Sequence, residues 1–201
     1  MVDKNRQESF KERYETGLIP WDDQYPPPEL MDLAARLEPG RALDLGSGYG
    51  RTSIFLAKQG WQVDGVEFVP LAVEESRRRA KEAGVDQLTR FHVADVTNLD
   101  ALQGPFDLAV DIGCMHTLTI PELESYREEL KRLLRSGAVY LLFAHLRDLQ
   151  DDSEDAARWI DEAALLSIFS DGFSLIEAVH GITEVADNPP WSSAWYYYQR
   201  L

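Results

Sequence analysis

The chain has 201 residues, 44% of them apolar and 27% charged, and a net charge of −15 at pH 7. This length and composition predict a single domain, residues 1–201, with a full hydrophobic core. The acidic balance disfavours nucleic acid as a partner, because nucleic acid binding depends on cationic contacts, and favours a small molecule.

Targeting signals are missing from the sequence pattern. No apolar run approaches the length of a membrane span, and residues 1–6 lead into a polar helix without the apolar core of a secretory signal. Cys114 is the only cysteine, so no internal disulfide forms. We therefore expect a cytoplasmic protein with no membrane partner, and either a monomer or a homodimer.

The N-terminal region predicts two helices around an irregular segment. Residues 5–16 have helical propensity, and a second helix is expected over residues 29–37. Residues 17–28 end in three consecutive prolines, which force an extended path. Because this segment also contains several apolar side chains, including Trp21, we expect it to lie against the rest of the domain.

Strands and helices then alternate along the chain. The expected strands cover residues 42–45, 61–67, 90–94, 106–112, 138–145, 174–184 and 193–200. The expected helices cover residues 51–58, 70–84, 121–135 and 155–169. Only a loop joins the last two strands, so they should pair antiparallel. This alternation predicts an α/β domain whose mainly parallel sheet is covered on both faces.

A glycine-rich turn, residues 46–50, separates the first of these strands from its helix. Glycines let a ligand approach the bare backbone, and the helix that follows presents free N–H groups. Arg51 stands where a dinucleotide-binding fingerprint requires its third glycine. Asp44 adds a carboxylate before the turn, which suits a cationic ligand and repels a pyrophosphate. An NAD-binding site is therefore the less favoured alternative.

The pattern Asp44-x-Gly46-x-Gly48-x-Gly50 resembles motif I of the class I S-adenosylmethionine-dependent methyltransferases. The resemblance extends over nearly the whole chain and implies S-adenosylmethionine as the cofactor. It also implies a Rossmann-like, seven-stranded, mostly parallel sheet in the order 3-2-1-4-5-7-6, with the last strand antiparallel and helices on both faces.

Acidic side chains end four of the expected strands. They are Asp44, Glu67, Asp95 and Asp111. Ligands of open α/β sheets bind beyond the carboxyl ends of the strands. Carboxylates gathered there need a cation or hydrogen-bond donors to offset their repulsion. The four residues are therefore candidates for a common ligand site.

The family resemblance implies roles for these candidates. Glu67 would accept the ribose hydroxyls, Asp95 the adenine amino group, and Asp44 would lie near the cofactor's ammonium group. The turn with Gly46, Ser47, Gly48 and Gly50 would approach the methionine portion. Val96 and Asp111 complete the expected cofactor-binding set.

A closer resemblance rests on two short segments. Ile19-Pro20-Trp21-Asp22 resembles the entry segment of the thiopurine, tellurite-resistance and halide/thiol methyltransferase group. The implied arrangement is that residues 1–28 cover the cofactor, with Trp21 over the ligand. Residues 111–116 resemble the Asp-Arg-Gly and Asp-x-Gly-Cys-x-His variants of that group and its relatives, but Ile112 replaces the arginine, so no role of that arginine is carried over.

Methyl transfer from a sulfonium requires alignment, desolvation and, for some acceptors, a base. His116 is the candidate catalytic base, because imidazole titrates near neutral pH and this residue follows the fourth strand; packing or capping is its alternative role. His145 is the second candidate, and Trp159 and Trp191 lie where they could roof a pocket. No cluster has the spacing of metal ligands, so no metal is expected.

These observations lead to two hypotheses. The first is an S-adenosylmethionine-dependent methyltransferase that modifies an oxygen, sulfur or nitrogen atom of a small-molecule acceptor. The alternative is an S-adenosylmethionine-binding module without transferase activity, either regulatory or an inactive partner subunit.

Overall fold

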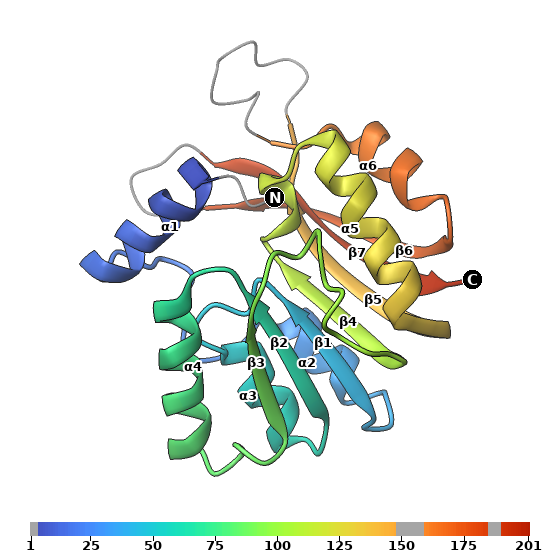
Figure 1. Ribbon diagram of the computed structural model, residues 1–201. Helices are drawn as coiled ribbons and strands as arrows, with labels where there is room; N and C mark the ends of the chain where they lie inside the picture. The colour runs from blue at the N-terminus through green and yellow to red at the C-terminus, as the bar shows by residue number, and fades with distance from the viewer. Residues whose placement is uncertain (1–3, 148–158, 185–189) are drawn as a thin grey trace.

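The computed structural model describes residues 4–147, 159–184 and 190–201. Seven strands form one sheet in the order β3-β2-β1-β4-β5-β7-β6 (Figure 1). β7 runs antiparallel to its neighbours, β5 and β6, and the other strand pairs of the described residues are parallel. The fold class and strand order expected from the sequence are confirmed.

Two helices precede the sheet. They are α1 (Lys4–Thr16) and α2 (Pro28–Ala34). Pro28 occupies the first turn of α2, where a missing N–H has no consequence. The helix ends at Ala34, three residues before the predicted end.

The first half of the sheet follows the expected alternation. Its elements are β1 (Arg41–Leu45), α3 (Arg51–Lys58), β2 (Gln62–Glu67), α4 (Pro70–Glu82) and β3 (Thr89–Val93). β1 pairs in parallel with both β2 and β4, so the glycine-rich turn lies at the centre of the sheet, where the strand order reverses.

The second half begins with β4 and ends with the antiparallel strand. Its elements are β4 (Phe106–Ile112), the 3-10 turn η1 (Met115–Thr117), α5 (Ile120–Leu133), β5 (Leu134–His145), α6 (Glu162–Phe169), β6 (Phe173–Thr183) and β7 (Trp191–Arg200). β5 starts four residues before its predicted beginning, and Trp191 lies inside β7 rather than in the loop before it.

Helix α6 begins later than the sequence pattern predicts. The prediction placed its start at residue 155, and residues 155–158 lie outside the described part of the chain. Ile160 instead forms a parallel bridge with Leu146. The Asp161 side chain then accepts the Ala164 N–H at 2.8 Å and caps the helix.

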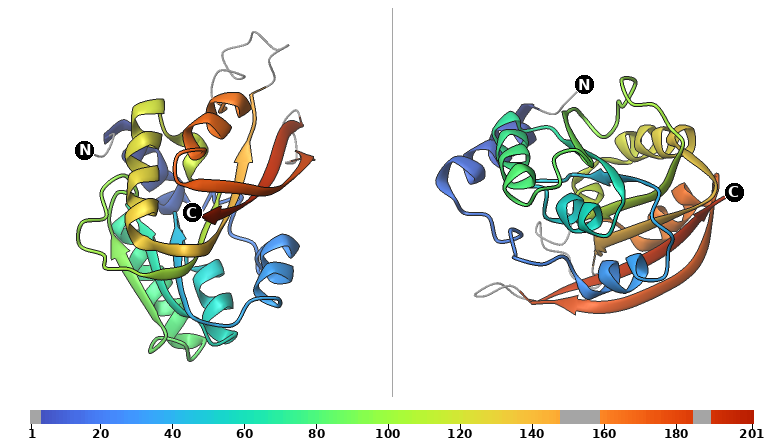
Figure 2. Two further views of the ribbon diagram at one scale, coloured as in Figure 1. Left: turned by 90° about the vertical axis from the view of Figure 1, so that its right-hand side faces the viewer. Right: turned by 90° about the horizontal axis from the view of Figure 1, so that it is seen from below.

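Each face of the sheet carries its own hydrophobic core. Helices α2, α3 and α4 pack on one face, while α5 and α6 pack on the other, so that α2 and α5 lie on opposite sides (Figure 2). Successive side chains of β1 alternate between the two cores: Ala42 belongs to the α2–α4 core, and Leu43 to the α5–α6 core. This alternation decides which strand-end carboxylates can meet.

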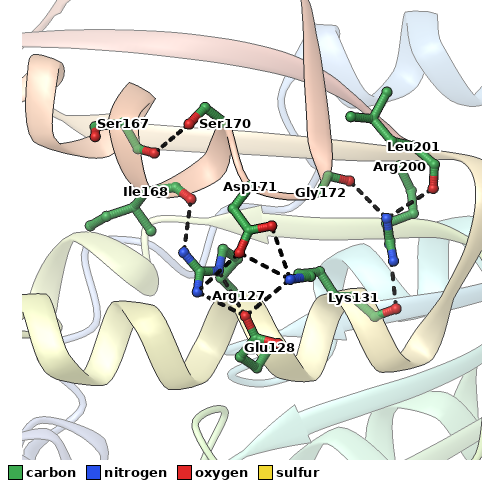
Figure 3. A network of polar contacts seen from close by, with 10 residues as sticks. All are labelled: Arg127, Glu128, Lys131, Ser167, Ile168, Ser170, Asp171, Gly172, Arg200 and Leu201. Atoms are coloured by element: carbon green, nitrogen blue, oxygen red, sulfur yellow. Dashed lines mark hydrogen bonds and ion pairs between the residues drawn. The ribbon is translucent and has the colours of Figure 1, made fainter.

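An ion-pair network fixes the sheet's outer strands to α5 (Figure 3). Asp171, in the turn between α6 and β6, lies 3.0 Å from the Lys131 ammonium and 3.4 Å from the Arg127 guanidinium of α5. Arg200, at the end of β7, donates to the Gly172 carbonyl at 3.0 Å. These contacts hold the β6–β7 pair at the end opposite to the candidate site.

Candidate functional site

A hollow lies at the carboxyl edge of the sheet, around the glycine-rich turn. Gly46 and Gly48 have φ angles of 70° and 52°, a region that side chains other than glycine rarely adopt. A Cβ on Gly46 would lie 2.5 Å from Cys114 Cβ, so the turn packs closely against the loop after β4. The hollow is lined by Trp21, Asp22, Asp44, Gly46, Ser47, Gly48, Tyr49, Arg51, Thr52 and Ile112.

Asp44 contributes a buried carboxylate to this hollow. Its side chain is 3% exposed, and Ser53 of α3 donates a hydroxyl hydrogen bond to it at 2.6 Å. Burial raises the pKa of Asp44 to about 6, although the Ser53 bond and the nearby Arg51 charge act in the other direction. A cationic group bound beside Asp44 would stabilise its ionised form.

Glu67 lies at the end of β2 and is also buried. It accepts backbone N–H groups from Val69 at 2.8 Å and from Gly48 at 3.3 Å, which ties the glycine-rich turn to the start of α4. Burial raises its pKa to about 7. Two carboxylate oxygens accept about four hydrogen bonds, so Glu67 retains capacity for further donors such as hydroxyl groups.

Asp95 follows β3 in a tight turn. One of its oxygens, Oδ1, accepts both the N–H and the hydroxyl of Thr97, at 3.0 and 2.8 Å. No hydrogen bond to Oδ2 occurs within the described residues. The side chain of Val96 is buried in the α5–α6 core, so only its backbone is available to a ligand.

Asp111 does not join the carboxylates of the hollow. Side chains alternate along β4, so Asp111 points to the α5–α6 face, and its neighbour Ile112 lines the hollow. Its fully buried carboxylate accepts N–H groups from Cys114 at 2.7 Å and Met115 at 3.0 Å, and the Tyr126 hydroxyl at 2.9 Å. Burial raises its pKa to about 7. Asp111 thus holds the loop that carries His116.

The N-terminal helix crosses the edge of the sheet above the hollow. Arg6 of α1 forms an ion pair of 2.9 Å with Glu122 of α5, and Gln7 donates to the Phe68 carbonyl before α4 at 2.8 Å. Tyr14 is buried on the same side, and a Cβ on Gly48 would lie 3.2 Å from its hydroxyl oxygen. The helix therefore contacts both α5 and the segment just before α4.

Residues 17–28 continue across the same region. The Trp21 ring packs against Phe10 and Tyr14 of α1, with centroid distances of 5.6 and 6.0 Å. Asp22 forms a bidentate ion pair with Arg79 of α4 at 2.8 Å.

Not all of this segment is buried. Asp23 pairs with Arg51 at 3.1 Å, but Leu18 and Tyr25 are 71% and 65% exposed. The expectation that the apolar side chains of the segment pack against the domain therefore holds for Ile19 and Trp21 and is wrong for these two.

An aromatic cluster lies beside the hollow, formed by His116, His145, Trp159 and Trp191. The His116 ring centroid is 4.7 Å from that of His145 and 5.2 Å from that of Trp159, and the two tryptophan centroids are 5.5 Å apart. Burial lowers the pKa of His116 to about 3, and His145 adds a smaller effect in the same direction. His116 is therefore neutral at physiological pH.

Sequence reasoning missed several residues of the site. Tyr49 and Ile112 line the hollow, and Tyr14 approaches Gly48, yet none of the three was among the predicted site residues. The period-two alternation of a strand is the one signal that points to Ile112: Asp44 pairs with Val110, so Ile112, two residues on, shares the Asp44 face of the sheet. The position of Tyr14 depends on the path of residues 17–28, which no local pattern specifies.

A larger hollow of about 310 Å³ lies elsewhere, at the edge strand β3. Its lining residues are Arg77, Ala80, Asp86, Thr89, Arg90 and Phe91. None of the sequence motifs contributes to it. Within the described residues, no group of three or more His, Cys, Asp or Glu side chains could hold a metal ion, and no helix is long and apolar enough to cross a membrane.

The fold and the site together define a Rossmann-like domain with a ligand site at the glycine-rich turn. A family model described as a methyltransferase domain matches residues 42–137. The 2-heptyl-1-hydroxyquinolin-4(1H)-one methyltransferase of Mycobacteroides abscessus is 26% identical over 175 residues, which cover 83% of this chain and 77% of that protein.

Solved structures agree with this match. One, described as "Conversion of a Disulfide Bond into a Thioacetal Group during Echinomycin Biosynthesis", has a TM-score of 0.80 at 25% identity and covers 96% of this chain and 91% of that one. TehB from Haemophilus influenzae has a TM-score of 0.75 at 16% identity and covers 95% and 67%, so its likeness concerns the fold alone.

The chain belongs to the class I S-adenosylmethionine-dependent methyltransferases. Its cofactor is S-adenosylmethionine. The sequence-based prediction of this superfamily and cofactor is confirmed, and the enzyme hypothesis takes the place of the binding-module alternative.

Proposed function

We propose that this enzyme transfers a methyl group to an oxygen, sulfur or nitrogen atom of a small molecule. The observation that carries the proposal is the aromatic cluster of His116, His145, Trp159 and Trp191, which packs at the carboxyl ends of β4 and β5, the sheet edge that also carries the glycine-rich turn. The acidic net charge and the quinolone substrate named for the Mycobacteroides relative support the same conclusion.

The residues in and around the glycine-rich turn fit the cofactor. Ser47 has a buried hydroxyl oxygen with no hydrogen-bond partner in the described structure, and Glu67 retains capacity for hydroxyl donors. Asp44 offers a buried carboxylate to an ammonium group. When bound, S-adenosylmethionine supplies a methyl group already activated on a sulfonium.

We propose for these residues the roles that the family resemblance implies. Glu67 binds the ribose, Asp95 the adenine amino group through its second oxygen, and Asp44 the ammonium group. The turn from Gly46 to Gly50 contacts the methionine portion through its backbone. Asp111 positions the loop after β4 and does not itself reach the cofactor.

The direct test is calorimetry with S-adenosylhomocysteine, followed by turnover with a panel of small oxygen, sulfur and nitrogen nucleophiles. We expect binding, and a mass increase of one methyl group on at least one acceptor class. Binding without methylation of any acceptor, including those in a metabolite extract, would contradict the proposed activity.

The pH dependence of cofactor binding follows from the raised pKa values of Asp44 and Glu67. In the ligand-free protein, the stabilisation from their protonated forms is complete below about pH 4 and is lost as the pH rises through about 6 to 7. The ammonium and ribose hydroxyls of S-adenosylhomocysteine favour the ionised forms, so binding releases protons and strengthens from about pH 5 to pH 8.

This pH dependence is measurable as the thermal shift caused by S-adenosylhomocysteine at several pH values. The shift should grow with pH, and calorimetry in buffers of different ionisation enthalpy should show proton release near pH 6.5. Glu67→Gln should flatten the dependence, because its amide does not titrate. A shift that is equal at pH 5.5 and pH 8 would rule out this coupling.

We also propose that residues 17–28 form a cover over the cofactor, held by the Asp22–Arg79 ion pair. Arg79→Ala removes that pair, so the segment should open more often, and proteases should cut it roughly two- to fivefold faster, as expected from losing about 0.5–1 kcal/mol. S-adenosylhomocysteine should slow the cutting in both proteins. Limited proteolysis with mass spectrometry gives the rates.

Arg78→Ala is the matched control for the cover. Arg78 pairs only with Glu75 and Glu82 on its own helix, among the residues the structure describes. Its loss should leave the cutting rate near that of the wild type. If the cofactor product leaves the rate unchanged in all three proteins, the segment is a fixed part of the domain.

A further inference from the structure

The imidazole of His116 is held in one tautomer by its neighbour. The backbone N–H of His145 donates to Nδ1 of His116 at 3.5 Å. A neutral imidazole has one donor and one acceptor nitrogen, so accepting at Nδ1 places the proton on Nε2. His116 therefore presents an Nε2–H donor on the other side of its ring.

This arrangement is unsuited to a general base. A base needs a nitrogen with a free lone pair, and the peptide N–H of His145 occupies that nitrogen. The ring is 8% exposed, and burial opposes its protonation. The sequence-based expectation that His116 removes a proton thus finds no support in its hydrogen bonding.

The titratable groups around His116 come from several elements. His145 lies on β5, and Cys114 and Asp111 precede the 3-10 turn η1. The Arg6–Glu122 ion pair reaches η1 because Arg6 also donates to the Thr117 carbonyl. Of these, only His145 contributes to the lowered pKa of His116.

The remaining surface of the cluster is aromatic. His145 contacts the rings of Trp159, Trp191 and Phe143 at centroid distances of 4.7, 5.5 and 5.2 Å. Its Nδ1 is buried without a hydrogen-bond partner in the described residues. Trp191 remains partly exposed, so the cluster offers an aromatic surface on which a flat molecule can stack.

We propose that His116 is a hydrogen-bond donor to the methyl-accepting atom, and that the cluster selects a flat aromatic acceptor whose hydroxyl or thiol is ionised when bound. This inference rests on the methyl transfer proposed above. The acceptor atom supplies the electron pair for the new bond to carbon, and the carbon–sulfur bond breaks with its pair left on sulfur. An anionic acceptor has no proton to lose, so no base is needed.

The donor has a defined task in this scheme. An apolar aromatic pocket disfavours an anion and raises the pKa of a bound hydroxyl or thiol, whereas a hydrogen bond to the ionised form lowers that pKa. The Nε2–H group keeps the acceptor ionised after water has left. Removing the donor should therefore shift the ionisation of the bound acceptor to higher pH.

Two coloured probes test this directly. 4-Nitrophenol and 4-nitrothiophenol absorb visible light as anions, so their ionisation in the complex with S-adenosylhomocysteine is read without turnover. The full-length wild type and His116→Gln, which keeps an N–H donor, should bind the anions. His116→Phe keeps an aromatic ring but has no N–H donor, so it should raise the pKa of the bound probe.

Turnover should follow the same order. We expect kcat/KM to fall about 10- to 100-fold in His116→Phe, the range for losing a hydrogen bond to a charged group, and less than about fivefold in His116→Gln. His180→Gln is the matched control, because His180 is an exposed histidine of β6 that contacts Glu162. Its rates and pH profile should equal those of the wild type.

Each readout has an outcome that overturns the inference. An inflection near pH 6 to 7 that persists when the acceptor is changed and vanishes in His116→Gln would make His116 the base. Nitrogen-15 spectra that place the His116 proton on Nδ1 would remove the donor. Failure of both probes to bind at millimolar concentration would overturn the acceptor class.

The proposed function fails separately from this inference. If the wild type does not bind S-adenosylhomocysteine, the enzyme's cofactor site as a whole is contradicted. If S-adenosylhomocysteine and the probes bind, and His116→Phe leaves the bound probe ionised as in the wild type, methyl transfer stands and only the donor role of His116 falls.

Discussion

Replacing Asp111 with alanine is expected to lower the free energy of unfolding by roughly 3–5 kcal/mol. The substitution leaves two backbone N–H groups, of Cys114 and Met115, and the Tyr126 hydroxyl without their acceptor. Met115 and Tyr126 are fully buried and Cys114 is partly buried, and each lost partner costs about 1–3 kcal/mol. Urea unfolding followed by circular dichroism measures the difference.

Two variants separate the contributions. Tyr126→Phe removes one donor and leaves both N–H bonds to Asp111 intact, but it also leaves the Tyr140 hydroxyl without the partner 3.0 Å away. It should cost about 1–2 kcal/mol. Asp111→Asn keeps one oxygen acceptor and should be milder than alanine. If alanine is tolerated with a loss below about 1 kcal/mol, Asp111 is not the organiser of the loop.

Glu67→Ala should weaken S-adenosylhomocysteine binding by roughly 1.5–3 kcal/mol, a factor of about 10 to 150, because hydrogen bonds to a charged acceptor are lost. The same change releases the Gly48 N–H, which at present joins the glycine-rich turn to the end of β2. The enthalpy and affinity from calorimetry give the effect, and an unchanged affinity would remove Glu67 from the site.

Glu67→Gln is the informative companion, because it resembles the protonated carboxyl. Since the pKa of Glu67 is raised to about 7, the wild type approaches the glutamine variant as the pH falls. The two proteins should therefore differ most in affinity at about pH 8 and least at about pH 5.5. Asp95→Asn should have a smaller effect at every pH, because one neutral amino group meets that residue.

The fold was predictable because its signals are local. Apolar strands alternate with amphipathic helices, and the glycines of residues 46–50 mark the switch point, so strand order follows from the family layout. The start of α6 was not predictable from periodicity. Its true boundary depends on the cap at Asp161 and on the bridge from Ile160 to Leu146, a tertiary contact.

The site was predictable in position and less so in detail. Asp44 lines the hollow, and Glu67 accepts a hydrogen bond from the glycine-rich turn. Both positions follow from the ends of their strands. Asp111 occupies an equivalent strand end but faces the opposite core, where a tyrosine of α5 meets it. The direction of a side chain depends on strand register, and its partner depends on packing, so carboxylates at similar sequence positions acquire different tasks.

The position of β7 has a consequence for how the protein is made. This strand is translated after β6 yet lies between β5 and β6. Until it emerges from the ribosome, β5 keeps one edge unpaired, with apolar residues such as Tyr140 and Leu141 still to be covered. A nascent chain halted before Trp191 should therefore be a preferred client of holdase chaperones, and synonymous codons that slow synthesis just upstream of β7 should increase aggregation without altering the finished enzyme.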